Sequence, residues 1–295
     1  MEMHFILNPI ANNGKSANNF LEIEKFLKES NVKCFVYHTK YMHHATQIAR
    51  EISSQNKQVH IISAGGDGTL SDVLNGIVDF KNTYLSVLPL GSGNDFAMNF
   101  KEISHTNQIK NLKRLIEQKS THIDFLVVND KYRCMNALGA GMVPNVIKKY
   151  MTYKHFSQKT KYRLAVISKS LFFTVHNISY SIDEGKTWNN VKTITFSVGN
   201  GETVGGGIKL IPNASVNDGY ITVSMVKKIN RLLTLHNLNK IMKGKTATLK
   251  AHQTFNCKHL LVKIDRKLFD IDGELFENTD QLSIKIIHNE LNFII

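Results

Sequence analysis

The chain has 295 residues, of which 42% are hydrophobic and 21% charged, and an excess of Lys and Arg gives a formal net charge of +13. This length corresponds to about two domains of roughly 100 to 200 residues each, and the hydrophobic content excludes an intrinsically disordered chain. The three cysteines, Cys34, Cys134 and Cys257, are far apart in sequence and form no CxxC pair, which argues against a disulfide framework or a zinc site.

Apolar strand patterns alternate with amphipathic helix patterns in the first part of the chain, which is typical of a doubly wound α/β domain. Strands are expected near residues 3–8, 34–39, 59–63 and 85–90, and helices near residues 15–29, 43–54, 69–78 and 95–101. From about residue 126 the pattern changes to short alternating strands broken by Gly and Asn, which predicts an antiparallel β-sandwich. Its expected elements are strands near 191–198, 220–226, 260–264 and 268–271, with helices near 161–175 and 229–242.

Residues 62–71, ISAGGDGTLS, join an apolar strand to an amphipathic helix through a glycine-rich turn. The apolar residues that follow repeat at the i, i+3, i+4, i+7 spacing of a helix, so Gly65-Gly66-Asp67-Gly68-Thr69 is expected to cap that helix. Glycines let the main chain approach an anion closely, a helix N-terminus supplies free N–H groups, and the Thr69 hydroxyl adds a donor. The turn therefore predicts a phosphate-binding site.

Asp67 is the acidic residue of this turn, and a carboxylate directed at phosphate groups would repel them. We expect it to hold Mg²⁺, to position a nucleophile or to take a proton from one. The sequence leaves these three roles open, and a simple βα turn with an acidic residue at the helix start is the alternative.

A second apolar strand runs into Gly91-Ser92-Gly93-Asn94-Asp95-Phe96-Ala97 and repeats the arrangement of strand, small-residue turn and acidic helix start. In open parallel sheets the ligand lies beyond the carboxyl ends of the strands, so two such turns make a nucleotide site the leading hypothesis. The first strand ends in Asn8-Pro9, and Lys15 a few residues later can contact a phosphate as a point charge. No Walker A sequence, GxxxxGK[ST], is present.

Further motifs follow in a fixed order along the chain. The complete set is Asn8-Pro9 with Gly14-Lys15, Thr39 with His44-Ala45, Gly65–Thr69 with Asn75-Gly76, Pro89–Ala97, Ile123-Asp124, Asn136 with Gly139 and Gly141, Gly199-Asn200-Gly201, Gly205-Gly206-Gly207, Asn217–Tyr220 and Asp272-Gly273-Glu274. This ordered set resembles the diacylglycerol kinase catalytic-domain family, which includes soluble bacterial lipid kinases and the sphingosine and ceramide kinases. The resemblance covers nearly the whole chain.

The resemblance implies a fold and a domain organisation. A doubly wound, NAD-kinase-like α/β domain that binds nucleotide would span residues 1–125, and an antiparallel β-sandwich that binds the lipid acceptor would span residues 126–282. The final stretch, about 283–295, would pack back on the first domain. The active site is expected in the cleft between the two domains.

The resemblance also implies ATP and Mg²⁺ as cofactors. Catalytic Mg²⁺ would be organised by Asp67, Asp95 and Asp124, partly through water, and a second, structural Mg²⁺ by Asp218 with the carbonyls of Ser215 and Tyr220. An Asp-Gly turn between strands is the alternative for Asp218. The residues expected to bind ATP are Asn8, Lys15, Thr39, Gly65, Gly66, Gly68, Thr69, Gly91, Ser92 and Asn94.

Two residues are candidates for the general base. In the bacterial relatives the glutamate of the DGE motif, here Glu274, lies near the acceptor hydroxyl. In sphingosine-kinase-like members the aspartate of GGDGT, here Asp67, is given the role of general base. The chain departs from the family pattern at Ser71, Asp72 and Val143, where relatives usually carry Asn, Glu and an acidic residue. The change at Val143 concerns acceptor recognition more than nucleotide binding.

We therefore expect transfer of the γ-phosphate of ATP to a lipid hydroxyl, with diacylglycerol as the first acceptor to test and phosphatidic acid as its product. Two alternatives stay open: an NAD kinase-like phosphotransferase, which shares the fold and the GGDGT turn, and a non-catalytic lipid-binding regulator, suggested by the departures. The acceptor itself is not encoded in a spacing pattern, because a lipid pocket is built from loosely placed apolar side chains.

The positive charge indicates an anionic partner. Residues 148–163 carry six Lys or Arg, no acid and four aromatic residues, a composition that suits an anionic lipid surface, although a solvated face is the alternative. No nucleic-acid recognition motif accompanies the charge, so nucleic acid is not an expected partner. No signal peptide or apolar stretch of about 18 residues is visible, so we expect a cytoplasmic protein that contacts the membrane peripherally and reversibly. Relatives often pair, which makes a homodimer possible.

Overall fold

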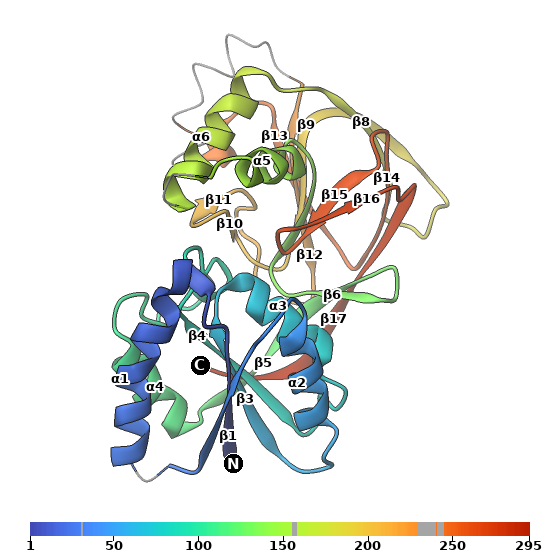
Figure 1. The fold of residues 1–295 in the computed structure, drawn as a ribbon. Coiled ribbons are helices and arrows are strands. Elements are labelled where there is room, and N and C mark those ends of the chain that lie inside the picture. Colours follow the sequence, from blue (N-terminus) through green and yellow to red (C-terminus); the bar gives the residue numbers. More distant parts are fainter. Residues whose placement is uncertain (31, 155–157, 229–239, 241–244) are drawn as a thin grey trace. The chain divides into compact units, whose positions relative to one another are not determined.

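The computed structural model describes residues 1–30, 32–154, 158–228, 240 and 245–295. The chain divides into two compact units. Unit 1 consists of Met1–Asp124 together with His288–Ile295, and unit 2 of Phe125–Ile287. Each unit has its own group of strands (Figure 1) and its own buried core, and strand β17 pairs with strands of both groups.

Unit 1 contains a parallel sheet. Its strands are β1 (Glu2–Leu7), β2 (Cys34–His38), β3 (Val59–Gly65) and β4 (Thr83–Pro89), in the order β4-β3-β1-β2, and the end of β17 (Gln281–Ile294) pairs with β4 in parallel. The chain passes from β1 to β2 on one side and then to β3 on the other. The strand order therefore reverses between β1 and β3, and such a switch point is where open α/β sheets bind their ligands.

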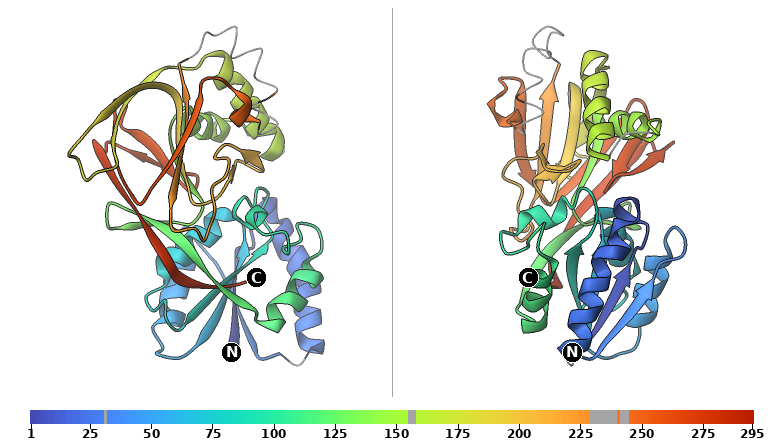
Figure 2. Two further views of the ribbon diagram at one scale, coloured as in Figure 1. Left: turned by 180° about the vertical axis from the view of Figure 1, so that it is seen from behind. Right: turned by 60° about the vertical axis from the view of Figure 1, so that its left-hand side comes forward.

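Helices cover both faces of this sheet. They are α1 (Lys15–Glu29), α2 (His44–Ser53), α3 (Asp67–Gly76) and α4 (Gln108–Glu117), with a 3₁₀ turn, η1 (Ala11–Gly14), ahead of α1. Helices α1 and α4 lie side by side on one face, and α2 and α3 pack together on the other (Figures 1 and 2). On the first face, Phe20, Ile23 and Leu27 of α1 are buried against the strands, as their helical spacing predicts.

The predicted strands of unit 1 and the helix over residues 15–29 are confirmed, and α2 lies inside its predicted range. The prediction of a helix near residues 95–101 is wrong, because only a 3₁₀ turn, η2 (Phe96–Asn99), forms there. The main-chain N–H groups of Asp95 and Phe96 are bound by the Asp67 side chain, and Phe100 is extended with φ −119° and ψ 119°. Helix α4 and the strand that follows it were not predicted.

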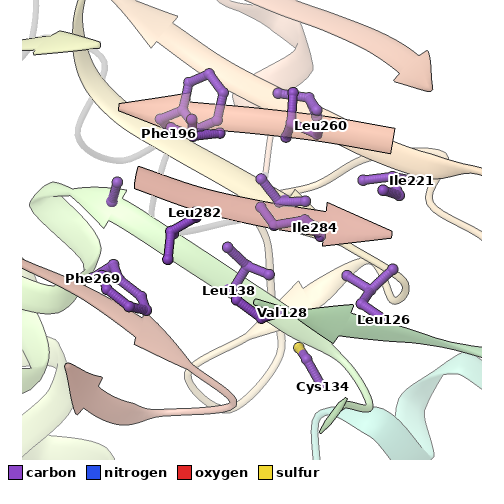
Figure 3. Packing of buried hydrophobic residues seen from close by; sticks show 14 of the residues in the cluster. Leu126, Val128, Cys134, Leu138, Phe196, Ile221, Leu260, Phe269, Leu282 and Ile284 are labelled. Atoms are coloured by element: carbon purple, nitrogen blue, oxygen red, sulfur yellow. The ribbon is translucent and has the colours of Figure 1, made fainter. Parts of the chain in front are cut away.

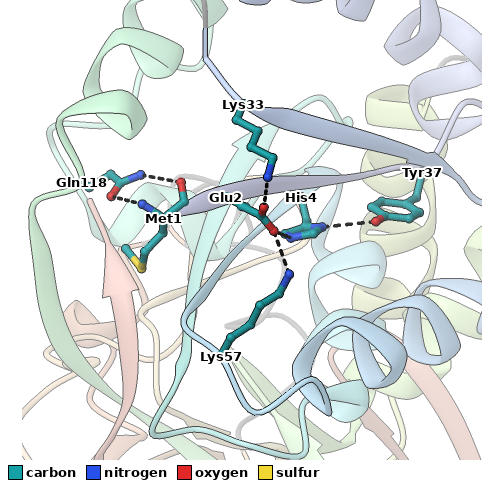
Figure 4. Close-up of polar contacts among 7 residues, drawn as sticks. All are labelled: Met1, Glu2, His4, Lys33, Tyr37, Lys57 and Gln118. Atoms are coloured by element: carbon teal, nitrogen blue, oxygen red, sulfur yellow. Dashed lines mark hydrogen bonds and ion pairs between the residues drawn. The ribbon is translucent and has the colours of Figure 1, made fainter.

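A charged and aromatic cluster ties the first strands together at the start of the sheet (Figure 4). The Glu2 carboxylate is bound by the ammonium groups of Lys33 and Lys57, the latter at 2.8 Å, and these contacts lower the pKa of Glu2 to about 2. His4 is buried, stacks on Phe35 with ring centroids 5.1 Å apart, and contacts the Tyr37 hydroxyl at 3.2 Å. The cluster therefore adds side-chain contacts between β1 and β2 to their main-chain pairing.

Unit 2 is formed mainly by antiparallel strands, which confirms the predicted change of architecture. The longest path of paired strands runs β16-β15-β7-β9-β8-β14-β17, and β12 joins β9 to β13. Strand β5 (Ser120–Val128) begins in unit 1 and continues into unit 2. The other strands are β6 (Tyr132–Cys134), β7 (Ala137–Gly141), β8 (His176–Ser181), β9 (Asn189–Gly199), β10 (Thr203–Val204), β11 (Ile208–Lys209), β12 (Ile221–Lys227), β13 (His252–Cys257), β14 (His259–Ile264), β15 (Leu268–Ile271) and β16 (Glu274–Glu277).

The strands of unit 2 enclose an apolar core to which Phe196, Leu260 and Ile284 contribute (Figure 3). Helices α5 (Met142–Met151) and α6 (Gln158–Leu171) pack on each other beside the sheet, and a short 3₁₀ turn, η3 (Thr246–Thr248), precedes β13. The helix predicted near 161–175 is α6, shifted toward the N-terminus. Apart from Lys240, the helix predicted near 229–242 lies outside the described residues. In the described part of the chain, no helix combines the length and hydropathy needed to cross a bilayer.

Candidate active site

The switch point between β1 and β3 carries the first two predicted turns. Asn8 follows β1 directly, and its Nδ2 donates to the Thr69 hydroxyl in α3 at 3.3 Å. The Asn8 Oδ1 accepts the N–H of Ile10 at 3.2 Å, which shapes the chain as it leaves the strand. Two segments that are 61 residues apart therefore meet at the carboxyl ends of neighbouring strands.

Helix α3 begins at Asp67, two residues earlier than predicted. Its first helical hydrogen bond runs from Leu70 N to Gly66 O, so the N–H groups of Gly68 and Thr69 have no carbonyl partner within the helix. Gly68 is exposed, and a Cβ placed on it would meet no atom within 4 Å. The helix N-terminus is thus open at Gly68, as an anion-binding site requires.

The turns after β3 and β4 pack main chain against main chain. Gly65 O accepts the N–H groups of Leu90 and Gly91 at 2.8 and 2.9 Å. A Cβ on Gly91 would lie 2.4 Å from Gly66 Cα, so only glycine permits this approach at residue 91. Gly65 has a similar constraint, because its Cβ would lie 2.4 Å from the Thr69 hydroxyl oxygen.

Asp67 joins these two turns through its side chain. Oδ2 accepts the N–H of Asp95 and Oδ1 accepts the N–H of Phe96, each at 3.0 Å. Burial raises the pKa of Asp67, and the main-chain N–H groups of Phe96 and Asp95 oppose this rise. Each carboxylate oxygen keeps a further lone pair, so an ordered water or a cation can still be bound there.

The turn after β4 is shaped by its own side chains. Asn94 has a left-handed backbone with φ +57°, and its side chain binds both the N–H and the carbonyl of Gly91, at 3.0 and 2.9 Å. Ser92 donates its hydroxyl to Asn12 Oδ1 at 2.9 Å. This last bond links the β4 turn to the loop after β1, so the three turns hold one another in place.

The other predicted nucleotide-binding residues lie close to these turns in the chain. Lys15 is exposed and is the first residue of α1, after Gly14 in a left-handed conformation with φ +82°. Thr39 follows β2, and its N–H donates to Leu7 O at 2.8 Å, which places its main chain next to the end of β1. Both residues therefore belong to the carboxyl edge of the sheet.

The three predicted Mg²⁺ carboxylates are all in unit 1. Asp95 is 6% exposed and Asp124 is fully buried. Asp124 Oδ1 accepts bonds from His288 Nδ1 at 2.8 Å and from the Asn289 N–H at 2.9 Å. Over the described residues, the oxygens of the three carboxylates do not all lie within 4.8 Å of one another, so a shared cation would be reached partly through water.

In unit 2, Glu274 is exposed and begins β16, directly after a tight turn at Asp272 and Gly273. Asp218 Oδ1 accepts the N–H of Tyr220 at 2.9 Å, and the Ser215 hydroxyl contacts Asn217 Oδ1 at 2.9 Å. The Asp218 bond is that of an Asx turn. A second, structural Mg²⁺ with ligands from residues 215, 218 and 220 stays a prediction.

Several residues that shape the site were missed by the sequence reasoning. Asn12, His288 and Asn289 bind predicted site residues. Asn12, Asn13 and Gly14 form a run of left-handed residues, and Asn-Asn-Gly is a recognisable signal for such a conformation. The contacts of His288 and Asn289 with Asp124 carry no such signal, because 164 residues separate His288 from Asp124.

Comparison with known proteins gives the family. Residues 2–128 match the family model described as the diacylglycerol kinase catalytic domain, and residues 137–292 match the YegS C-terminal NAD kinase beta sandwich-like domain. YtlR of Bacillus subtilis, a candidate lipid kinase by its name, is 27% identical over 299 residues, which cover 93% of this chain and 94% of YtlR. A diacylglycerol kinase of Staphylococcus aureus is 28% identical over 216 residues, covering 69% of this chain and 64% of that protein.

Solved structures agree on the fold. The crystal structure of a diacylglycerol kinase from Bacillus anthracis has a TM-score of 0.77 at 21% identity, covering 99% of this chain and 96% of that one. A further structure from the same strain has a TM-score of 0.78 at 22% identity and the same coverage. The second family match spans more than half of the chain, and together the two matches extend from residue 2 to residue 292. The chain therefore belongs to the lipid kinase family that combines a diacylglycerol kinase catalytic domain with a YegS-type β-sandwich domain.

Proposed function

We propose that this kinase transfers the γ-phosphate of ATP to the hydroxyl of diacylglycerol, with phosphatidic acid as the product. The observation that carries the proposal is the set of three turns at the carboxyl ends of β1, β3 and β4, held by the Asn8–Thr69, Ser92–Asn12 and Asp67–Phe96 bonds. Phosphoryl transfer depends mainly on positioning and charge neutralisation, and rigid main-chain turns with open N–H groups serve both.

The residues present fit ATP with Mg²⁺. Gly68 and Gly66 leave the start of α3 clear of bulky side chains, and the Gly68 and Thr69 N–H groups are available to a phosphate oxygen. Lys15 adds a point charge at the start of α1. Mg²⁺, when bound, would neutralise charge on the transferred phosphoryl group, and Asp67, Asp95 and Asp124 are the acids that would hold it.

We propose Glu274 as the general base. Asp67 has both oxygens engaged by main-chain N–H groups, which suits an anchor or a ligand reached through water better than a proton acceptor. Glu274 lies at the exposed start of a strand, where a carboxylate can accept the proton of an acceptor hydroxyl. The chain departs from the family pattern at Ser71, Asp72 and Val143, and these departures do not change the residues proposed to bind ATP, to hold Mg²⁺ or to act as general base.

The acceptor is proposed from chemistry and family. One relative, which matches 69% of this chain, carries the name diacylglycerol kinase, and the chain belongs to a lipid kinase family. We further propose that the enzyme works at the cytoplasmic membrane surface without spanning it. The chain between Asp130 and Asp183 contains no acidic residue and carries Lys148, Lys149 and Lys154, while Met151 and Phe172 are 61% and 74% exposed.

The experiment is a transfer assay with labelled ATP and Mg²⁺ in mixed micelles that contain one acceptor at a time. The panel holds diacylglycerol, monoacylglycerol, phosphatidylglycerol, a sphingoid base and an undecaprenyl-type alcohol, with NAD as a water-soluble acceptor. Label in phosphatidic acid alone supports the proposal. Label in another lipid would support a lipid kinase reaction but with a different acceptor. Label in NADP, or transfer to no acceptor, contradicts it.

A further inference from the structure

The turn that carries Glu274 has a defined geometry. Strands β15 and β16 are antiparallel, and Ile271 pairs with Glu274 across the two residues that connect them. Asp272 has φ +47° and Gly273 has φ +89°, the left-handed pair found in a type I′ hairpin turn. Glu274 is the first residue after this turn, so its position follows that of the turn.

The carboxylate of Asp272 binds the chain ahead of β7. It accepts the main-chain N–H groups of Met135, Asn136 and Ala137 at 2.7, 3.0 and 3.1 Å. The Cys134 thiol donates to the same carboxylate at 3.3 Å. In the opposite direction, the Asp272 N–H donates to Ala137 O at 2.9 Å.

A second aspartate supports the same turn from the strand. Asp270 is buried on β15; burial raises the pKa of its carboxyl group well above the ordinary value, and the main-chain N–H of Gly273 opposes this rise. A Cβ on Gly139 of the neighbouring strand β7 would lie 2.9 Å from Asp270 Oδ1, so the glycine provides the space that this carboxylate fills. The turn is therefore bound to residues 135–137, and Asp270 is buried on the strand that leads into it.

We propose that Asp272 is a positioning residue of the reaction, which sets the place of Glu274 by binding the I′ turn to residues 135–137. This inference rests on the proposed function, in which Glu274 is the general base. A carboxylate is required because its two oxygens accept several N–H donors at once. The amide of an asparagine offers one acceptor oxygen and directs its own N–H groups at those donors.

Asp183 provides a matched control in the same unit. It lies in the loop between β8 and β9, where its carboxylate accepts the Thr187 N–H at 2.9 Å and contacts the hydroxyls of Thr187 and Ser181 at 2.6 and 2.7 Å. Asp183→Asn therefore removes a comparable set of bonds from a hairpin that carries no proposed catalytic group. This variant shows whether the loss of carboxylate bonds elsewhere in the unit changes kcat, although the Asp183 bonds are more exposed than those of Asp272.

The test combines kinetics with hydrogen exchange of the full chain. Asp272→Asn is expected to lower kcat about 10- to 100-fold with an unchanged KM for ATP, because a base misplaced by about 1 Å loses most of its effect. In a Glu274→Gln background the same substitution should change kcat by less than about twofold, since both act through one group. Amide exchange at residues 274–276 should become about tenfold faster, while Asp183→Asn leaves kcat and this exchange unchanged.

Three results would overturn the inference: equal loss of kcat in both backgrounds, a lowered melting temperature with normal kcat, or unchanged exchange at residues 274–276. The exchange measurement needs no turnover, so it decides the inference even if Glu274→Gln retains activity and the proposed base is wrong. If Asp272→Asn does not fold, Cys134→Ala replaces it. That variant should lower kcat about twofold to fivefold, with recovery in Cys134→Ser, which keeps a donor to Asp272.

Discussion

The Asp67 carboxylate accepts the main-chain N–H of Phe96 at 3.0 Å, although 29 residues separate them. The bond connects the turn after β3 to the turn after β4, and a second bond to the Asp95 N–H completes the connection. These two side-chain bonds add to the main-chain bonds from Leu90 and Gly91 to Gly65 O that join the same turns. The family resemblance implies that Asp67 organises Mg²⁺, and its hydrogen bonds show that it also connects two turns of the site.

Asp67→Asn should weaken both stability and nucleotide binding. An amide can accept only one of the two N–H bonds cleanly, and the unfolding free energy should fall by about 1 to 3 kcal/mol. The KM for ATP should rise, because the Gly91–Asn94 turn loses its anchor. Urea denaturation and ATP titration measure the two effects. Asp79→Asn, which removes side-chain bonds to Asn82 in a loop before β4, is the control and should leave the KM for ATP unchanged.

Gly68→Ala should separate binding from stability. Its Cβ would meet no protein atom within 4 Å, and alanine favours helical backbone over glycine by about 0.5 to 1 kcal/mol, so stability should be kept or slightly raised. The new methyl group would occupy the proposed phosphate position, and the Kd of ATP should rise about tenfold, equivalent to about 1.4 kcal/mol. Calorimetric titration with ATP and thermal unfolding give both quantities. Unchanged affinity for ATP would place the phosphates elsewhere.

Gly76→Ala is the counterpart at the other end of the same helix. Its Cβ would lie 2.3 Å from Thr46 O and 2.8 Å from Ala49 Cβ, at the contact between α2 and α3. Overpacking of this kind typically costs about 1 to 3 kcal/mol, so the melting temperature should fall. The affinity for ATP of the folded fraction should stay close to that of the wild type.

His60 should make unit 1 sensitive to acid. Its ring is fully buried beside Ser86, with Nε2 2.7 Å from the hydroxyl, and burial lowers its pKa to about 3 from an ordinary value near 6.5. Between those two values the unfolded chain binds a proton that the folded chain does not, so stability falls as the pH falls. From about pH 7 to about pH 5 this single group should remove about 2 kcal/mol of unfolding free energy.

The matched variant is His60→Gln, which keeps hydrogen-bonding capacity toward Ser86 and removes the titration. Denaturant unfolding at a series of pH values should show a slope reduced by about 1.4 kcal/mol per pH unit below about pH 6. An identical slope in the two proteins would assign the acid sensitivity to other groups.

Membrane contact should depend on the basic residues of segment 148–163 in unit 2. Replacing Lys149 and Lys154 by glutamate should weaken binding to vesicles that contain phosphatidylserine, since each basic group near such a surface contributes about 1 kcal/mol. Flotation of the protein with anionic and with neutral vesicles measures the effect. Lys25→Glu on the exposed side of α1 makes the same charge change elsewhere. Equal flotation with neutral and anionic vesicles would exclude an electrostatic docking face.

Much of unit 1 could be predicted because local patterns decide it. Phe20, Ile23 and Leu27 repeat at helical spacing, and α1 spans the predicted residues. Helix α4 was missed although Leu112 and Leu115 share a face and Asn107 binds the Lys110 N–H as its cap. The apolar spacing and the cap are present in the sequence, but the surrounding residues are mostly polar. The helix therefore becomes recognisable only from its packing on the sheet.

The candidate site also has features that could be predicted from the sequence and features that could not. The glycines at residues 66 and 91 and the open helix start could be expected, because turn chemistry is local. The bonds from Asp67 to the next turn and from Asp124 to His288 could not be expected, since they depend on which strands are neighbours and on the path of the last strand. The helix predicted near 95–101 does not form because the backbone becomes extended at Phe100, which ends the segment after a 3₁₀ turn.

The most direct measurement is the formation of labelled phosphatidic acid from diacylglycerol and labelled ATP in mixed micelles, with wild type and Glu274→Gln run side by side. We expect Mg²⁺-dependent product with the wild type, and a kcat about 10² to 10⁴ times lower for the folded variant. Absence of phosphatidic acid with the wild type, or equal turnover by both proteins, would contradict it.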